Sequence, residues 1–159
     1  MAVQMQIGNK NYSLAPDVKK IAEDLIKSDK FLQTQNLDLA KIEYLQVSPN
    51  ISKFVQAKCI KSSSFVKFFG NVDYLVTVSG DIWNQLDPKT KEILVLHELM
   101  HIKISYNKKG NVLFQLRDHN VKDFLYIIES FGISWFSTLK AQVSSIYDLD
   151  PKEEDHITL

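Results

Sequence analysis

Apolar residues recur along this chain with two different spacings, which divide it into predicted helices and strands. In the stretch "SLAPDVKKIAEDLIKSDKF", Pro16 and Asp17 are typical of a helix opening, and an apolar stripe at helical spacing follows them. The members of this stripe are Val18, Ile21, Ala22, Leu25 and Ile26. The pattern predicts an amphipathic first helix after a short polar start.

Alternation of apolar and polar residues then predicts strands. The segments 41–47 and 53–61 flank the turn signal Ser48-Pro49-Asn50, so they favour a hairpin with one face in water. A serine triplet at 62–64 breaks the alternation. The segment 73–80, "DYLVTVSG", is rich in β-branched and aromatic residues and predicts a third strand.

Helical spacing returns at Asp87, which can cap a helix whose first position is Pro88. From Ile93 to Ile102 the sequence is apolar except at His97, Glu98 and His101. We expect a helix of about five turns that ends near Ser105. A polar turn at residues 106–111 follows it.

The last third of the chain contains a second apolar-periodic segment, from about His119 to Ser130, with Gly132 as its expected end. Its apolar positions are Val121, Phe124, Leu125, Ile127 and Ile128. A short final helix is expected around Leu139, Val143 and Ile146, and the acidic tail 148–159 is expected to fray. These elements indicate one domain over residues 1–159 with its core at about 12–147.

Composition excludes several classes of protein. Lysine plus arginine and aspartate plus glutamate number 19 each, so the overall charge does not indicate a nucleic-acid or anionic-membrane partner. No apolar run reaches the roughly 18 residues of a membrane span, and the amino terminus does not resemble a signal peptide. Cys59 is the only cysteine, which rules out an internal disulfide. We therefore expect a cytoplasmic protein with no membrane partner, and the sequence leaves its oligomeric state open.

The three polar residues in the apolar helix have the spacing of a metal site. His97 and His101 lie four residues apart and point the same way on a helix, so their imidazoles can bind one metal ion. Glu98 lies about 100° further round, where its carboxylate can reach a water on that ion. This His-Glu-x-x-His arrangement is typical of zinc hydrolases, in which the glutamate is the catalytic base. The competing interpretation, two core histidines beside a solvated Glu98, needs a wet helix face that this apolar stretch hardly offers.

A catalytic zinc usually has three protein ligands and one open position, so a third ligand is required. His119, at the expected start of the next helix, is the first candidate, and Glu129 on the same helix is the second. His156 lies in the acidic tail and is a poor candidate. Asp118 and Asp123 are expected either to orient a ligand histidine or to be favourable charges at a helix start.

With these residues identified, the chain resembles the zincin-like metallopeptidases and, more narrowly, the putative phage metallopeptidase family. Three stretches carry the resemblance: "VSGDIWNQL", "LVLHELMHI" and "RDHNVKDF", in that order. With the preceding strands, the similarity spans about residues 42–131. Val121, Asp123 and Phe124 fit the family's His-Asp-Val-x-Asp-Phe-like stretch, whereas Asn120 and Lys122 depart from it.

The resemblance implies a peptidase with one Zn²⁺ held by His97, His101 and His119, and with Glu98 as the catalytic acid and base. It also implies an α+β, zincin-like fold in which a small, three-stranded, mostly antiparallel sheet packs on the active-site helix. The strand near residues 73–79 would then be an edge for an extended peptide substrate.

Two other functions stay open. One is a catalytically silent, zinc-stabilised binding module, against which Glu98 argues because a structural site has no use for a buried carboxylate that is not a ligand. The other is a DNA-associated protease of the SprT-like type, for which a basic patch would be needed. The residues that offer one are Lys53, Lys58, Lys61 and Lys67. Such lysines are more often a solvated strand face, so the sequence does not favour nucleic acid.

Overall fold

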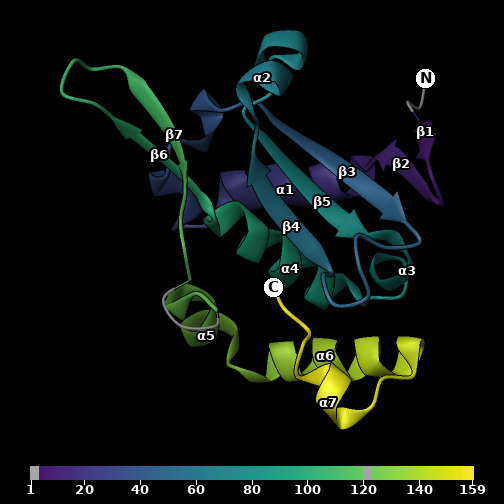
Figure 1. The fold of residues 1–159 in the computed structure, drawn as a ribbon. Helices are drawn as coiled ribbons and strands as arrows, with labels where there is room; N and C mark the ends of the chain where they lie inside the picture. The colour runs from purple at the N-terminus through teal and green to yellow at the C-terminus, as the bar shows by residue number, and fades with distance from the viewer. Residues whose placement is uncertain (1–3, 120–122) are drawn as a thin grey trace.

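The computed structural model describes residues 4–119 and 123–159 and has a mixed α+β architecture, with the helices α1 and α4 packed against one face of a sheet (Figure 1). The strands are β1 (Gln4–Ile7), β2 (Lys10–Leu14), β3 (Ile42–Ser48), β4 (Ala57–Lys61), β5 (Tyr74–Ser79), β6 (Ile102–Tyr106) and β7 (Val112–Leu116). The α-helices are α1 (Pro16–Ser28), α2 (Ser64–Gly70), α3 (Gly80–Trp83), α4 (Pro88–Met100), α5 (Leu125–Phe131), α6 (Ser134–Tyr147) and α7 (Pro151–Glu154). Two 3₁₀ turns, Leu32–Thr34 and Leu37–Leu39, follow α1.

The main sheet is larger than the expected three strands. Within the described residues it has five strands in the order β1-β2-β3-β5-β4, and β6 and β7 form a separate two-stranded sheet. The β3–β5 pair is parallel, and the other pairs in the main sheet are antiparallel. The prediction missed β1 and β2 because these short strands at the start of the chain are mostly polar.

The predicted hairpin between β3 and β4 is wrong. Residues 49–56 carry the chain from the end of β3 past β5, so β4 pairs with β5 and not with β3. Neighbouring strands lie only about 4.8 Å apart, which a segment of this length spans with ease. The strand at residues 74–79 is therefore interior, and β4 is the edge, which also corrects the expected edge for a peptide.

The first helix is confirmed, and α4 is only partly as expected. The buried face of α1 consists of Val18, Ala22 and Leu25. The N-terminal cap of α4 is as predicted, because the Asp87 side chain accepts a hydrogen bond from the Thr90 N–H at 3.1 Å and Pro88 is the first helical residue. Residues 93–100 of α4 are all buried, so this helix has no wet face near the histidines.

The end of α4 corrects the sequence prediction. The helix ends at Met100, not near Ser105, and β6 begins at Ile102. Residues 102–106 alternate between apolar and polar side chains, and each pairs with a residue of β7, from Ile102 with Leu116 to Tyr106 with Val112. Long-range pairing with β7 therefore outweighs the helical continuation that the apolar content predicted.

The C-terminal third is more ordered than expected. The second predicted helix, α5, begins at Leu125 rather than at His119, and it ends at Phe131, just before Gly132, whose φ of 78° suits a glycine. The expected short final helix is the 14-residue α6. Residues expected to fray form α7, and Ile157 beyond it is buried. The expectations for Asn120, Val121 and Lys122 lie outside the described residues.

None of the helices in the described part of the chain has the length and apolar content that crossing a membrane requires.

Candidate metal centre

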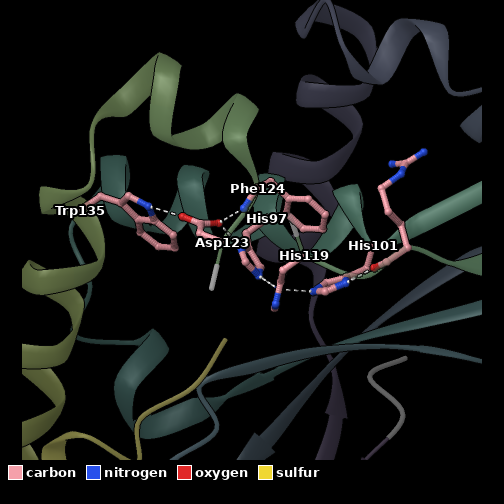
Figure 2. A network of polar contacts seen from close by, with 7 residues as sticks. His97, His101, His119, Asp123, Phe124 and Trp135 are labelled. Atoms are coloured by element: carbon pink, nitrogen blue, oxygen red, sulfur yellow. Dashed lines mark hydrogen bonds and ion pairs between the residues drawn. The ribbon is translucent and has the colours of Figure 1, made fainter. Parts of the chain in front are cut away.

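Three histidines from two separate segments meet at the end of α4 (Figure 2). His97 lies in the last turn of α4, His101 is the residue that follows the helix, and His119 follows β7. The His119 Nε2 atom lies 2.9 Å from His97 Nε2 and 3.0 Å from His101 Nε2. The β6–β7 hairpin thus returns the chain to the helix end and brings His119 to the other two.

The second ring nitrogen of His97 and of His101 is fixed by an acceptor. His97 Nδ1 lies 2.7 Å from the Asp123 carboxylate, and His101 Nδ1 lies 2.8 Å from the Arg117 carbonyl oxygen. A carbonyl oxygen and an ionised carboxylate only accept, so both Nδ1 atoms carry the proton. In the neutral rings, the lone pairs of both Nε2 atoms therefore face His119.

Three imidazole nitrogens this close could hold a metal ion between them, and the surroundings keep the rings in the neutral form that binds metal. Burial is the largest cause that lowers the pKa of His97, His101 and His119 below the ordinary histidine value. A neutral histidine releases no proton when its lone pair binds a metal ion. The donor set therefore fits a metal ion such as zinc.

Phe124 forms an apolar support beneath the three rings. The centroid of its ring lies 5.1 Å from that of His97, 5.0 Å from that of His101 and 5.1 Å from that of His119. Its side chain is fully buried, so it limits how each imidazole can turn. Contact with one rigid ring keeps the three nitrogens convergent.

Asp123 connects His97 to α6. One of its carboxylate oxygens accepts from His97, and the other accepts from the Trp135 indole N–H at 2.9 Å (Figure 2). Burial alone would raise the pKa of Asp123, but the hydrogen bonds from His97, the Phe124 backbone N–H and Trp135 lower it overall. Asp123 is therefore an anion that holds the His97 ring, the position that the expected role of orienting a ligand histidine requires. Asp118 is exposed, and its charge raises the pKa of His101 and of His119 in part.

Arg117 holds the ring of His101, as Asp123 holds the ring of His97. Its backbone N–H donates to the His101 carbonyl at 2.6 Å, while its own carbonyl accepts from the His101 ring. Its guanidinium donates to the Met100 carbonyl, one of the backbone groups left unpaired where α4 ends, and to Gln35. The end of α4 and the base of β7 are therefore fixed to each other at the site.

Glu98 is buried beside this centre, and its environment is not that of an ordinary structural carboxylate. Its Oε1 atom has no hydrogen-bond partner among residues 4–119 and 123–159. Burial raises the pKa of Glu98 to about 8, although the backbone N–H of Cys59 lowers it in part. Glu98 and His101 line one pocket of about 270 Å³, together with residues of β4. The carboxylate therefore faces a space next to the histidines.

The structure distinguishes the two candidates for the third ligand by position. Among the described residues, the group of side chains that could hold a metal ion consists of His97, His101 and His119. Glu129 is exposed on α5, and His156 is exposed near the C-terminus. His119 lies in a loop rather than at a helix start. The sequence did not predict that Arg117 would hold His101 or that Trp135 would donate to Asp123. A single basic residue and a tryptophan in an apolar helix carry no local signal for such roles.

Changing Asp123 to asparagine should weaken metal binding by about 10–100-fold, the usual effect of losing the group that holds a ligand histidine. Asparagine has nearly the same shape but lacks the charge that keeps the Nδ1 proton of His97 in place. Competition with a chromophoric chelator would measure the dissociation constant. The matched control is Asp118→Asn, which removes the neighbouring exposed carboxylate, and equal affinities in the two variants would contradict the role of Asp123.

Glu98 should contribute stability to the metal-free protein that is lost as the pH rises from about 4.5 to 8. The folded state keeps Glu98 protonated up to a pKa of about 8, whereas the unfolded chain releases that proton near 4.5. At Glu98 the folded state therefore binds more protons in this window, so the contribution of Glu98 to the free energy of unfolding falls with pH. The lowered pKa values of the three histidines act in the opposite direction, and they cancel when the wild type is compared with Glu98→Gln. Urea unfolding of metal-free wild type and Glu98→Gln across this range would measure the difference, and parallel curves would contradict it.

The fold and the site together define a mixed α+β protein with three histidines that could hold a metal ion at the end of a helix and a buried glutamate beside them. The chain belongs to the putative phage metallopeptidase family, whose model matches residues 10–147. This match confirms the resemblance seen in the sequence and extends it in both directions beyond residues 42–131. No curated protein and no solved structure matches the chain significantly.

Proposed function

We propose that this protein is a zinc-dependent peptidase in which Glu98 is the general base. The observation that carries the proposal is the buried Glu98 carboxylate, which has an oxygen without a partner among the described residues and lines the same pocket as His101. Leaving such a group unpaired costs free energy, so a protein retains it where the group has chemistry to perform. Membership of a metallopeptidase family supports the same activity.

In this proposal His97, His101 and His119 hold the metal. Bound there, zinc would lower the pKa of a water molecule and polarise the carbonyl of the peptide bond. Glu98 accepts the proton of the water and transfers it to the leaving amine. Its raised pKa suits both steps, because a carboxylate with a pKa near neutrality can take a proton and give it up at physiological pH.

The edge strand β4 is the natural platform for a peptide substrate. It borders the pocket with Ala57, Lys58 and Cys59, and its outer edge is not paired with another named strand. An extended peptide can add to such an edge through main-chain hydrogen bonds, which bind peptides of many sequences. A peptide on β4 would bring its backbone next to Glu98.

Neither alternative function gains support from an observation. In a catalytically silent module, burying the unpaired Glu98 carboxylate would cost free energy of folding and serve no chemical role. For the DNA-associated protease, two of the four lysines of the expected patch are ion-paired, Lys53 with Glu153 at 3.1 Å and Lys67 with Asp73. Ion pairing reduces the charge that these lysines can offer to phosphates.

The test of the proposed function is metal-dependent cleavage. Protein loaded with one equivalent of zinc is expected to cut an unstructured protein such as casein, a chelator is expected to stop the reaction, and added zinc to restore it. Mass spectrometry of the fragments would identify the bonds that are cut, and elemental analysis of the purified protein would identify the metal. Equal cleavage by the metal-free protein would contradict the proposal.

A further inference from the structure

The chain returns to the candidate metal centre at residues 157–159, after α7. Ile157 is buried, and the Thr158 backbone N–H donates to the Phe54 carbonyl at 3.0 Å. Thr158 also forms a parallel bridge with Val55, just before β4. Figure 1 shows this end of the chain beside β4 and α4. The segment is therefore attached to the strand that borders the pocket.

Several contacts hold the approach to this segment. Asp150 and Glu153 form a capping box at the start of α7, and Lys53 makes an ion pair with Glu153. The ring of His156 lies 5.8 Å from the ring of Phe54. Together with the backbone hydrogen bond of Thr158, these contacts hold residues 157–159 in one position.

The last two residues of this segment form one wall of the pocket that contains Glu98 and His101. Thr158 and Leu159 line this pocket together with Glu98 and His101, and Val55, Ala57 and Cys59 give it an apolar side. Burial raises the pKa of the Cys59 thiol, which therefore stays neutral and behaves as a small apolar side chain. The pocket, at about 270 Å³, is smaller than the roughly 300–1,000 Å³ of most ligand sites.

We propose that the 157–159 segment determines substrate specificity by closing this pocket so that it accepts a small or medium-sized apolar side chain next to the scissile bond. The inference rests on the proposed function, because it places the reacting bond beside Glu98. Leu159 limits the depth of the pocket, and the hydrogen bond from the Thr158 N–H to the Phe54 carbonyl holds the segment in place. The preferred substrates are therefore peptides with residues such as alanine, valine or leucine at this position, and not large aromatic ones.

Two variants test whether the 157–159 segment limits the size of the side chain that the pocket accepts. Leu159→Ala removes the side chain that limits the pocket, while Thr158→Pro removes the N–H that donates to Phe54 and so releases the segment. Thr158→Ala is the matched control, because it changes the same side chain but keeps that N–H. Circular dichroism and zinc content would show that each variant folds and binds metal.

Binding and cleavage are measured separately, so that failure of the wall and failure of the proposed function give different results. The binding probes are peptide hydroxamates, which chelate zinc, with a methyl, an isobutyl or a naphthylmethyl side chain. Wild type loaded with zinc is expected to bind the isobutyl probe about 10-fold or more tighter than the naphthylmethyl probe. Leu159→Ala and Thr158→Pro should lose this difference, and Thr158→Ala should retain it.

The same series is then repeated with fluorescence-quenched peptides that carry these side chains next to the scissile bond. A wild type that binds the probes with the expected preference but cleaves no peptide would contradict the peptidase function and support the wall. An unchanged preference in Leu159→Ala and Thr158→Pro would overturn the wall. If Thr158→Pro increased the binding affinity for every probe by the same factor, the specificity role of the segment would also be overturned. The segment would then cover the pocket without discriminating between side chains. Absence of any probe binding by zinc-loaded wild type would overturn that role as well.

Discussion

Glu98→Gln is expected to bind as much zinc as the wild type and to lose peptide hydrolysis by at least about 10²–10⁴-fold, the contribution of a positioned general base. Glutamine has nearly the same size and leaves His97, His101 and His119 untouched, so the metal content should not change. It cannot accept a proton from water at neutral pH. Loss of turnover with full metal occupancy would separate the role of Glu98 from that of a metal ligand.

Initial rates on a quenched peptide and elemental analysis of the same samples would measure both quantities. Glu92→Gln is the matched control, because it makes the same chemical change in the same helix away from the three histidines. Glu98→Gln with wild-type turnover would exclude the proposed base. Loss of zinc together with loss of activity would instead make Glu98 a metal ligand.

His119→Ala is expected to lose most of the metal, because it removes the nitrogen that faces both His97 and His101. Two histidines from one helix end would remain, which is one ligand short of the usual catalytic zinc site. The wild type should be stabilised by zinc at roughly 4 kcal/mol when free zinc is about 1,000 times the dissociation constant. His119→Ala should gain far less under the same conditions.

Thermal unfolding with and without zinc, together with the metal content of purified protein, would test this expectation. The comparison variant is Glu129→Ala, which changes the other sequence candidate and should keep both the metal and the zinc-dependent stabilisation, since Glu129 is exposed on α5. Full occupancy in His119→Ala would remove His119 from the ligand set.

The parts of the site that lie on one helix were predictable from the sequence, because their geometry is local. A spacing of four residues fixes the relative direction of His97 and His101 once the chain is helical, and α4 supplies that helix as far as Met100. The candidate His119 came from elimination and resemblance. Its actual position, in a loop after β7, depends on a hairpin that helical periodicity concealed.

Strand order could not be predicted in the same way. Alternation of apolar and polar residues located β3 and β4, and β-branched and aromatic content located β5, but neither signal contains information on which strands pair. The 49–56 loop decides that question, since it carries the chain past β5 to the edge of the sheet. Trp135 shows the same limit at the level of one side chain. Its hydrogen bond to Asp123 depends on how α6 packs, which no local pattern around Trp135 encodes.

The β6–β7 hairpin can change in length without changing the geometry of the site. Its base is fixed where Arg117 bonds His101 and where the Tyr74 hydroxyl donates to the Gln115 carbonyl at 2.8 Å. Its tip, Lys108 to Gly110, is exposed and far along the ladder from the histidines. Extra residues inserted at the tip would therefore leave the distance between His101 and His119 unchanged. This tip is the place where the protein can accept a fluorophore or an affinity tag, and where relatives can differ in length without any change in their chemistry.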